Sequence, residues 1–208
     1  MPLIDILNNY RSSIIECSTN LNIAFTTDGG GAYVYAQRQR EFIVESAFLK
    51  IFISWETYLE NAFVSYLLGE PTIAGRVVNK FATPVDFTHA QKLLIGTQRY
   101  VDWANSDIVI KLGGLYLEPN NPINVTISSI KSDMDDLKII RNSAAHMSST
   151  TNAALDALAT RKLRTPCSNY SVPQLVLTFD PIAPVNNQTI LNTYLLILDA
   201  AAESIATG

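Results

Sequence analysis

Apolar residues recur at helical spacing in two segments of the N-terminal third of the chain. Over residues 3–25 they repeat every three or four positions, which is typical of one buried helical face. The sequence Asp-Gly-Gly-Gly at residues 28–31 breaks this pattern and predicts a flexible turn. A second, longer helix is predicted over residues 33–68, because Gly69 and Pro71 supply a stop signal. These two segments are the long core helices of the predicted fold.

The middle of the chain has shorter apolar stretches that proline and glycine interrupt. Short helices are predicted near residues 73–81, after Asp86 and after Asn105, because Asp and Asn side chains cap helix N-termini well. Three breaks are expected around these helices, at Pro84, Gly96 and the pair Gly113-Gly114. These short helices are expected to pack around the long ones.

The C-terminal half carries three more helical patterns, over residues 125–147, 152–163 and 188–205. Residues 174–179 lie between two prolines and fit a short strand or an extended loop. Together the patterns predict an all-α fold, a compact helical bundle of two long core helices and several shorter ones. The whole chain, residues 1–208, is expected to form a single domain.

Composition and charge limit the class of protein and the kind of partner. Apolar residues make up 48% of the chain and charged residues 16%, so a sizeable core is available and much of the surface is neutral or covered by a partner. A homo-oligomer is therefore expected. The net charge of -4 excludes the non-specific hold that a basic protein has on nucleic acid. Any contact with RNA must be local.

Few signals point to a cofactor or to a compartment outside the cytoplasm. Cys17 and Cys167 are far apart and have no CxxC spacing or neighbouring histidine, so neither a zinc site nor a disulfide framework is expected. No metal or cofactor is predicted. The N-terminal residues lack the basic and apolar regions of a signal peptide, and Lys50 and Glu56 interrupt the most apolar helix. A cytoplasmic protein without a membrane span is expected.

Charged residues interrupt two of the apolar helical faces. Arg141 falls on the apolar stripe of the predicted helix 125–147, and Glu45 and Glu56 fall on that of helix 33–68. A charge on a buried face is costly unless it is paired, so Glu56, and after it Glu45, are the expected partners of Arg141. Two interpretations stay open. The pair is either a structural ion pair between packed helices or part of an active site.

His146 is one of two histidines and lies one helical turn beyond Asn142, whose amide is therefore expected to orient the imidazole. Arg141 and His146 diverge by about 140° on a straight helix. They converge only through the long arginine side chain, a frayed helix end or a second subunit, which favours a composite site. Taken alone, His146 would be interpreted as a helix-end residue that bonds a carbonyl of the last turn.

These residue types suit the cleavage of RNA through the ribose 2'-hydroxyl. An imidazole that titrates near neutrality can take or give a proton, and a guanidinium can stabilise charge on the phosphoryl oxygens. The motifs of other mechanisms are absent from the sequence: there is no GxxxxGK[ST], HExxH or GxSxG, and no cysteine beside a histidine.

The sequence RNSAAH, from Arg141 to His146, resembles the motif of the HEPN superfamily, an arginine followed after four to six positions by a histidine. The segment FLKIFISWETYLE, residues 48–60, is similar to the RiboL-PSP and related defence-associated HEPN types, and the resemblance covers residues 36–147. It implies a metal-independent endoribonuclease, acting as a toxin or antiviral-defence effector. It also implies a two-fold dimer that brings two motifs together. The catalytic roles carry over only to Arg141, Asn142 and His146. Glu56 and Glu45 are the supporting residues that the charge pattern predicts.

One departure from the family pattern concerns residue 148. HEPN toxins that pair with nucleotidyltransferase antitoxins have a tyrosine two residues after the histidine, and Ser148 occupies that position here. Control by modification of such a tyrosine is therefore not expected. An antitoxin or another regulatory protein stays open as a partner.

Two further sites have competing interpretations. Arg161, Lys162 and Arg164 either contact RNA phosphates or form a solvated helix end, where cations suit the helix dipole. His89 is interpreted as a solvated surface residue. The competing function, which the acidic net charge favours, is a non-catalytic HEPN-like helical module that binds RNA, nucleotide or a partner protein.

Overall fold

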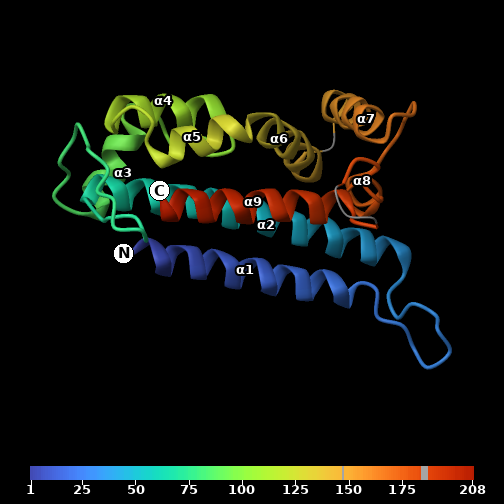
Figure 1. The fold of residues 1–208 in the computed structure, drawn as a ribbon. Helices are drawn as coiled ribbons and strands as arrows, with labels where there is room; N and C mark the ends of the chain where they lie inside the picture. Colours follow the sequence, from blue (N-terminus) through green and yellow to red (C-terminus); the bar gives the residue numbers. More distant parts are fainter. Residues whose placement is uncertain (147, 184–186) are drawn as a thin grey trace. The chain divides into compact units, whose positions relative to one another are not determined.

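The computed structural model of the protein describes residues 1–146, 148–183 and 187–208. Within these ranges the regular structure is helical, and β-type pairing is limited to isolated bridges, so the all-α prediction is confirmed (Figure 1). The helices are α1 (Leu3–Ile23), α2 (Gln37–Leu68), α3 (Phe87–Ile95), α4 (Ser106–Tyr116), α5 (Pro122–Ser129), α6 (Lys131–Ala145), α7 (Ser149–Leu163), α8 (Val172–Leu177) and α9 (Ile190–Thr207).

The chain divides into two compact units. Unit 1 comprises Met1–Arg11, Trp55–Asp135 and Ile197–Gly208, and unit 2 comprises Ser12–Ser54 and Asp136–Leu196. Helices α1, α2, α6 and α9 each contribute residues to both units. The expectation of one domain over residues 1–208 stays a prediction.

Aromatic residues form the core of unit 1. Trp55 and Tyr58 of α2 stack with ring centroids 5.7 Å apart, and Tyr10 of α1 contacts both rings. The Tyr58 hydroxyl donates a hydrogen bond to the Ala202 carbonyl of α9 at 2.6 Å. Burial is the largest cause that raises the pKa of Tyr58, so its hydroxyl stays protonated and able to donate. The buried ring cluster thus joins three helices of this unit.

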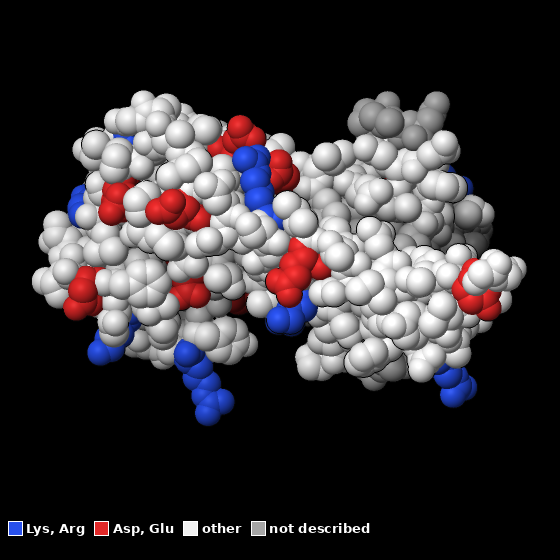
Figure 2. Space-filling model, turned by 90° about the horizontal axis from the view of Figure 1, so that it is seen from below, with Lys and Arg blue, Asp and Glu red and all other residues white. Residues whose placement is uncertain are grey.

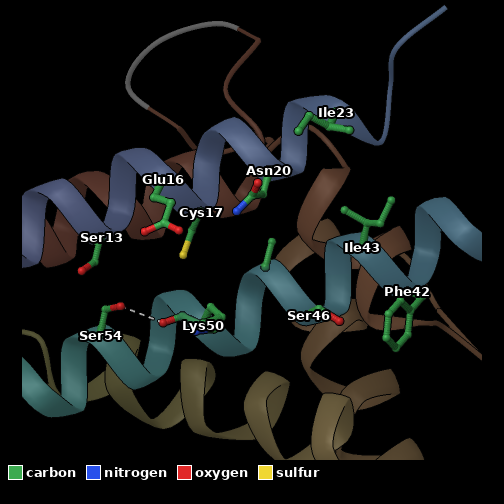
Figure 3. Close-up of a pocket in the computed structure, with 11 residues that line it drawn as sticks. Ser13, Glu16, Cys17, Asn20, Ile23, Phe42, Ile43, Ser46, Lys50 and Ser54 are labelled. Carbon is green, nitrogen blue, oxygen red and sulfur yellow. Dashed lines mark hydrogen bonds between the residues drawn. The ribbon is translucent and has the colours of Figure 1, made fainter.

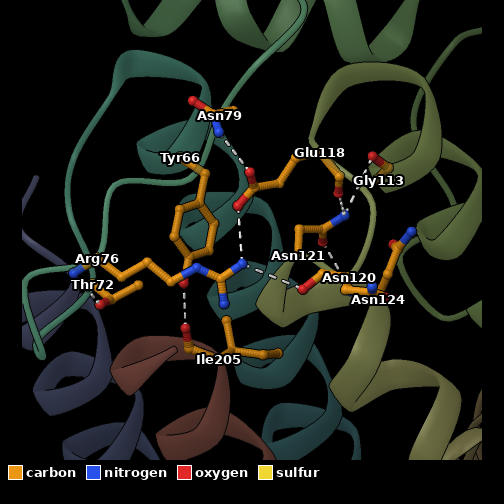
Figure 4. A network of polar contacts seen from close by, with 10 residues as sticks. All are labelled: Tyr66, Thr72, Arg76, Asn79, Gly113, Glu118, Asn120, Asn121, Asn124 and Ile205. Carbon is orange, nitrogen blue, oxygen red and sulfur yellow. Dashed lines mark hydrogen bonds and ion pairs between the residues drawn. The ribbon is translucent and has the colours of Figure 1, made fainter.

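A polar network in unit 1 joins the segment after α2 to the end of α4 (Figure 4). The Glu118 carboxylate accepts hydrogen bonds from Arg76 at 2.9 Å and from Asn79 at 2.7 Å, and these donors lower its pKa. The helix predicted near residues 73–81 is wrong. The backbone there pairs with the end of α4 instead, because Phe81 N donates to Tyr116 O at 2.8 Å.

The pair Gly113-Gly114 does not break a helix, contrary to expectation. Both glycines lie inside α4, which continues to Tyr116. A Cβ atom at Gly113 would lie 1.9 Å from the Asn124 side-chain oxygen of α5 (Figure 4). Glycine at this position therefore serves the close approach of two helices, although it weakens helix propensity locally.

The helix predicted over residues 125–147 is two helices in the structure. Asn121 caps α5 and Pro122 occupies its first turn, which are both favourable start signals. Ile130 leaves helical geometry, with φ of -106° and ψ of 16°, and separates α5 from α6. Apolar periodicity hid this break because Ile127 and Met134 are buried on either side of it. The last predicted residue, Met147, lies outside the described residues.

The extended segment predicted at residues 174–179 is also wrong, because α8 covers most of it. Ser171 and Gln174 form a reciprocal capping box at the start of α8, and Pro173 lies in its first turn. These local start signals outweigh the β-branched and aromatic composition of the segment. The other predicted helices are confirmed, although α2 begins at Gln37 rather than at residue 33.

Helix α9 is the one described helix that is long and apolar enough to cross a membrane, with a mean hydropathy of 1.2 over its 18 residues. Length and composition alone support this, and an apolar core helix passes the same test. In the structure α9 buries Ile190, Tyr194, Leu198 and Ile205. These residues are part of the core.

Candidate active site

The predicted motif lies in unit 2, at the C-terminal end of α6 (Figure 1). Arg141 and Asn142 are half-buried in the last turns of α6, and His146 is exposed just after the helix ends at Ala145. The His146 backbone nitrogen still donates to the Asn142 carbonyl at 2.9 Å. The imidazole therefore projects from a helix end that is open to solvent.

Asn142 contacts Arg141 rather than the imidazole. Its side-chain oxygen accepts a hydrogen bond from the Arg141 guanidinium at 3.1 Å. No side-chain hydrogen bond joins Asn142 to His146 in the described part of the chain. The Asn142 amide thus positions the Arg141 guanidinium. No contact among the described residues supports a role for Asn142 in selecting the tautomer of His146.

The two carboxylates expected to pair with Arg141, Glu45 and Glu56, belong to different units. Glu45 belongs to unit 2, and no ion pair joins it to Arg141 among the residues that the structure describes. The pKa of Glu45 is raised, first by burial and then by Glu41, and Arg141 is not among the causes. Glu56 belongs to unit 1, so its pairing with Arg141 stays a prediction. Within unit 2 the guanidinium is held by a neutral amide.

Thr151 ties the start of α7 to the carbonyl of His146. Its hydroxyl donates to His146 O at 2.7 Å and accepts from the Ser148 backbone nitrogen at 3.1 Å. The Thr151 backbone nitrogen donates in turn to the Ser148 hydroxyl, which completes a capping box. Ser143 of α6 donates to the Thr151 carbonyl at 3.1 Å. These hydrogen bonds hold the carbonyl group of His146 against the start of α7.

Sequence analysis did not identify this contact, although a signal for it exists. Ser148 and Thr151 have the three-residue spacing of a capping box before a helical segment. The same contact gives a structural role to Ser148, because its side chain caps α7.

The predicted basic cluster surrounds a buried carboxylate that sequence analysis also missed. Asp136 of α6 is 2% exposed and accepts hydrogen bonds from both terminal nitrogens of Arg161. Lys162 lies 3.1 Å from the same carboxylate, and Tyr194 of α9 donates to it at 3.0 Å. Arg164 stands apart as the exposed C-cap of α7. Arg161 and Lys162 therefore compensate a buried charge.

Unit 2 also contains a mixed polar and apolar pocket of about 450 Å³ between α1 and α2 (Figure 3). Glu16, Asn20 and Lys50 line it beside apolar side chains, and Cys17 lies in its wall. Burial is the largest cause that raises the pKa of the Cys17 thiol, followed by Glu16. This cysteine is therefore a poor source of thiolate.

The remaining surface offers no broad basic area on the face drawn in Figure 2. Uncharged residues dominate that face, and Lys and Arg side chains stand apart from one another. His89 is exposed as expected, and its Nδ1 atom accepts from the Val85 backbone nitrogen at 3.3 Å. Among the described residues, no group of three or more His, Cys, Asp or Glu is placed to hold a metal ion.

Comparison with known proteins adds no relative. No family model, no curated protein sequence and no solved structure matches this chain. A functional assignment therefore depends on the geometry of the residues at the end of α6 and at the start of α7.

Proposed function

We propose that the protein is a metal-independent endoribonuclease of the HEPN type, with Arg141 and His146 as its catalytic residues. One observation carries the proposal. Arg141 is held by the neutral Asn142 amide and forms no ion pair with a carboxylate among the described residues of unit 2, and an exposed histidine follows at the same helix end. A cation that no described anion of unit 2 neutralises is free to bind an anionic substrate such as a phosphodiester.

The chemistry requires a base, an acid and a stabiliser of negative charge. An imidazole takes the proton of the ribose 2'-hydroxyl as that oxygen attacks the adjacent phosphorus. The bond between phosphorus and the 5'-oxygen breaks, and the departing oxygen takes a proton from a second imidazole. Arg141 stabilises the charge on the phosphoryl oxygens. The products are a 2',3'-cyclic phosphate and a free 5'-hydroxyl.

A two-fold homodimer would supply the second imidazole. Because the directions of Arg141 and His146 diverge by about 140° on a helix, one chain brings them to one phosphate with difficulty. A two-fold interface near the end of α6 doubles every polar group beside its axis. Mixing inactive His146→Ala and Arg141→Ala protomers tests this. Each such heterodimer keeps one His146 and one Arg141, so it is expected to stay inactive if two imidazoles act. Regained cleavage would show that one imidazole suffices, and activity of a pure monomer would contradict the composite site.

The assay for the proposed function uses single-stranded RNA in excess EDTA. The wild-type protein is expected to cleave it, and His146→Ala to lose at least about a hundredfold in rate. His89→Ala is the matched control, because it removes the other histidine of the chain, which is also exposed. Cleavage that requires added Mg²⁺ or Mn²⁺, or equal loss in both variants, would refute the proposal.

A non-catalytic module that binds RNA, nucleotide or a partner protein is the second candidate. The pocket between α1 and α2 favours it, because Glu16 and Lys50 offer both signs of charge to one ligand (Figure 3). A toxic nuclease is expected to express poorly and to be tolerated once His146 is replaced. A binding module is expected to express equally well with either residue. A toxin or defence role, an antitoxin partner and a cytoplasmic location stay predictions.

A further inference from the structure

A second, smaller pocket of unit 2 lies between the start of α2 and α8. Its volume is about 270 Å³, and both apolar and polar side chains line it. The residues that matter for its chemistry are Phe25, Arg40, Glu41, Val44, Gln174 and Leu177. The pocket belongs to the same unit as Arg141 and His146.

Two residues that line this pocket, Arg40 and Phe25, both contact the ring of the neighbouring residue Tyr33. The Arg40 guanidinium carbon lies 3.9 Å from the centroid of the Tyr33 ring, and Tyr33 meets Phe25 edge-on with centroids 6.2 Å apart. Tyr33 is 52% exposed, so a flat group from solvent can reach this cluster. Stacking surfaces of this kind hold the bases of unpaired nucleic acid strands.

Arg40 is not neutralised by the residues that the structure describes. Its guanidinium forms no ion pair among them, and its Nε atom is buried without a hydrogen-bond partner. The Tyr33 ring is the contact that orients it. A cation held in this way is prepared for an external anion, because no internal carboxylate has to be displaced first.

The pocket lining also includes a hydrogen-bond acceptor and a donor that suit the edge of a nucleobase. One oxygen of Glu41 accepts from Gln37 at 2.9 Å, which leaves its second oxygen as an acceptor. The Gln174 side-chain oxygen accepts from the Ser171 backbone nitrogen, which leaves its NH2 group as a donor. Val44 and Leu177 supply the apolar surface between them. Donor, acceptor and stacking surface together match an unpaired nucleobase.

We propose that this pocket binds an unpaired nucleobase of single-stranded RNA, with Arg40 contacting the adjoining phosphate. The inference rests on the proposed ribonuclease function and names its substrate class. With a net charge of -4 the protein cannot rely on a long-range field to hold RNA, so local stacking with one cation has to supply affinity. Duplex RNA keeps its base faces stacked and is excluded from such a pocket.

The test measures binding apart from cleavage, with full-length protein carrying His146→Ala. A fluorescent single-stranded RNA and the same strand in a duplex are titrated by anisotropy. Arg40→Gln is expected to raise the Kd for the single strand about tenfold. Arg38→Gln, which makes the same charge change two residues away at an exposed position of α2, is expected to change it less than twofold. Tyr33→Ala is expected to weaken binding and Tyr33→Phe to preserve it.

Any of three binding results would overturn the pocket: equal effects of the Arg40 and Arg38 variants, unchanged binding by Tyr33→Ala, or equal affinity for single strand and duplex. Tyr33 is exposed, so its variants keep the test valid even if Arg40→Gln unfolds. Cleavage is measured in parallel with proteins that keep His146, namely the wild type and the single variant Arg40→Gln. Wild-type cleavage that Arg40→Gln leaves unchanged would overturn the pocket and spare the ribonuclease. Binding that depends on Arg40, without any wild-type cleavage, would do the reverse.

Discussion

Asp136 and Arg141 lie in the part of α6 that belongs to unit 2 and show two different uses of a charged residue. The Asp136 carboxylate is buried, and Arg161, Lys162 and Tyr194 satisfy it. Arg141 is half-buried and contacts one neutral amide. The number and charge of the partners, rather than the presence of a charge on an apolar helix, separate a structural group from a candidate for chemistry.

The largest expected effect is on stability at the Asp136 cluster. Asp136→Ala removes the anion and leaves the Arg161 and Lys162 cations together, of which the Lys162 side chain is only 13% exposed. Breaking a buried pair in this way costs about 3–5 kcal/mol of unfolding free energy. Urea denaturation of variant and wild type measures it. A loss below about 1 kcal/mol, the value of a surface pair, would contradict the structural role of Asp136.

Arg141→Ala is expected to show the opposite pattern, with cleavage lost and stability nearly kept. Loss of a charge stabiliser slows cleavage by at least about a hundredfold. The single hydrogen bond to Asn142 contributes only about 1 kcal/mol to stability. Rates and urea midpoints on the same preparations check both parts. A loss of stability like that of Asp136→Ala would mean that Arg141 has a buried carboxylate partner, as first expected for Glu56.

Thr151→Val tests whether the α6–α7 turn positions His146. Valine keeps the shape of threonine but loses the hydroxyl that donates to the His146 carbonyl. A loss of about 1 kcal/mol corresponds to roughly fivefold slower cleavage. Thr151→Ser restores the hydroxyl and is expected to recover most of the rate. An unchanged pH–rate profile in the valine variant would indicate a purely structural role for the hydroxyl.

The smallest expected effect concerns Glu45, and its sign is informative. Burial raises the pKa of Glu45, so the folded state disfavours the ionised form, and stability falls as pH rises through the folded pKa. Glu45→Gln is therefore expected to increase stability slightly at pH 7 and to change little at pH 3. If Glu45 instead paired with Arg141, the same substitution would destabilise the protein at pH 7. Thermal melting at both pH values distinguishes these results.

Local signals in the sequence predicted most of the fold. Asp86 and Asn105 are predicted N-caps, and their side-chain oxygens accept hydrogen bonds from backbone nitrogens at 2.7 Å and 3.1 Å. Two of the failures share one cause, which is a tertiary contact that apolar periodicity does not report. Gly113 lies inside a helix because Asn124 approaches it, and residues 73–81 pair with the end of α4. Neither partner is adjacent in the sequence.

The candidate site, too, could be predicted only where its residues are close together in the sequence. Arg141, Asn142 and His146 are close in sequence, so their place on one helix end followed from spacing. The partners of Arg161 and Lys162 did not, because Asp136 is 25 and 26 residues away along the chain. Asp136 also sits between the buried residues Met134 and Leu137, where a carboxylate is unexpected. A carboxylate between two buried apolar positions predicts that cations from elsewhere in the chain lie beside it, because a buried charge is costly unless it is paired.

The most direct test of the central claim uses a DNA oligonucleotide with one ribonucleotide, incubated with wild-type protein in EDTA. Cleavage through the 2'-hydroxyl is expected only at the bond on the 3' side of that ribonucleotide. The product should carry a 2',3'-cyclic phosphate, and His146→Ala should abolish it. Mass spectrometry identifies the product ends. Cleavage of the all-DNA strand, or products with a 3'-hydroxyl and a 5'-phosphate, would contradict the proposed mechanism.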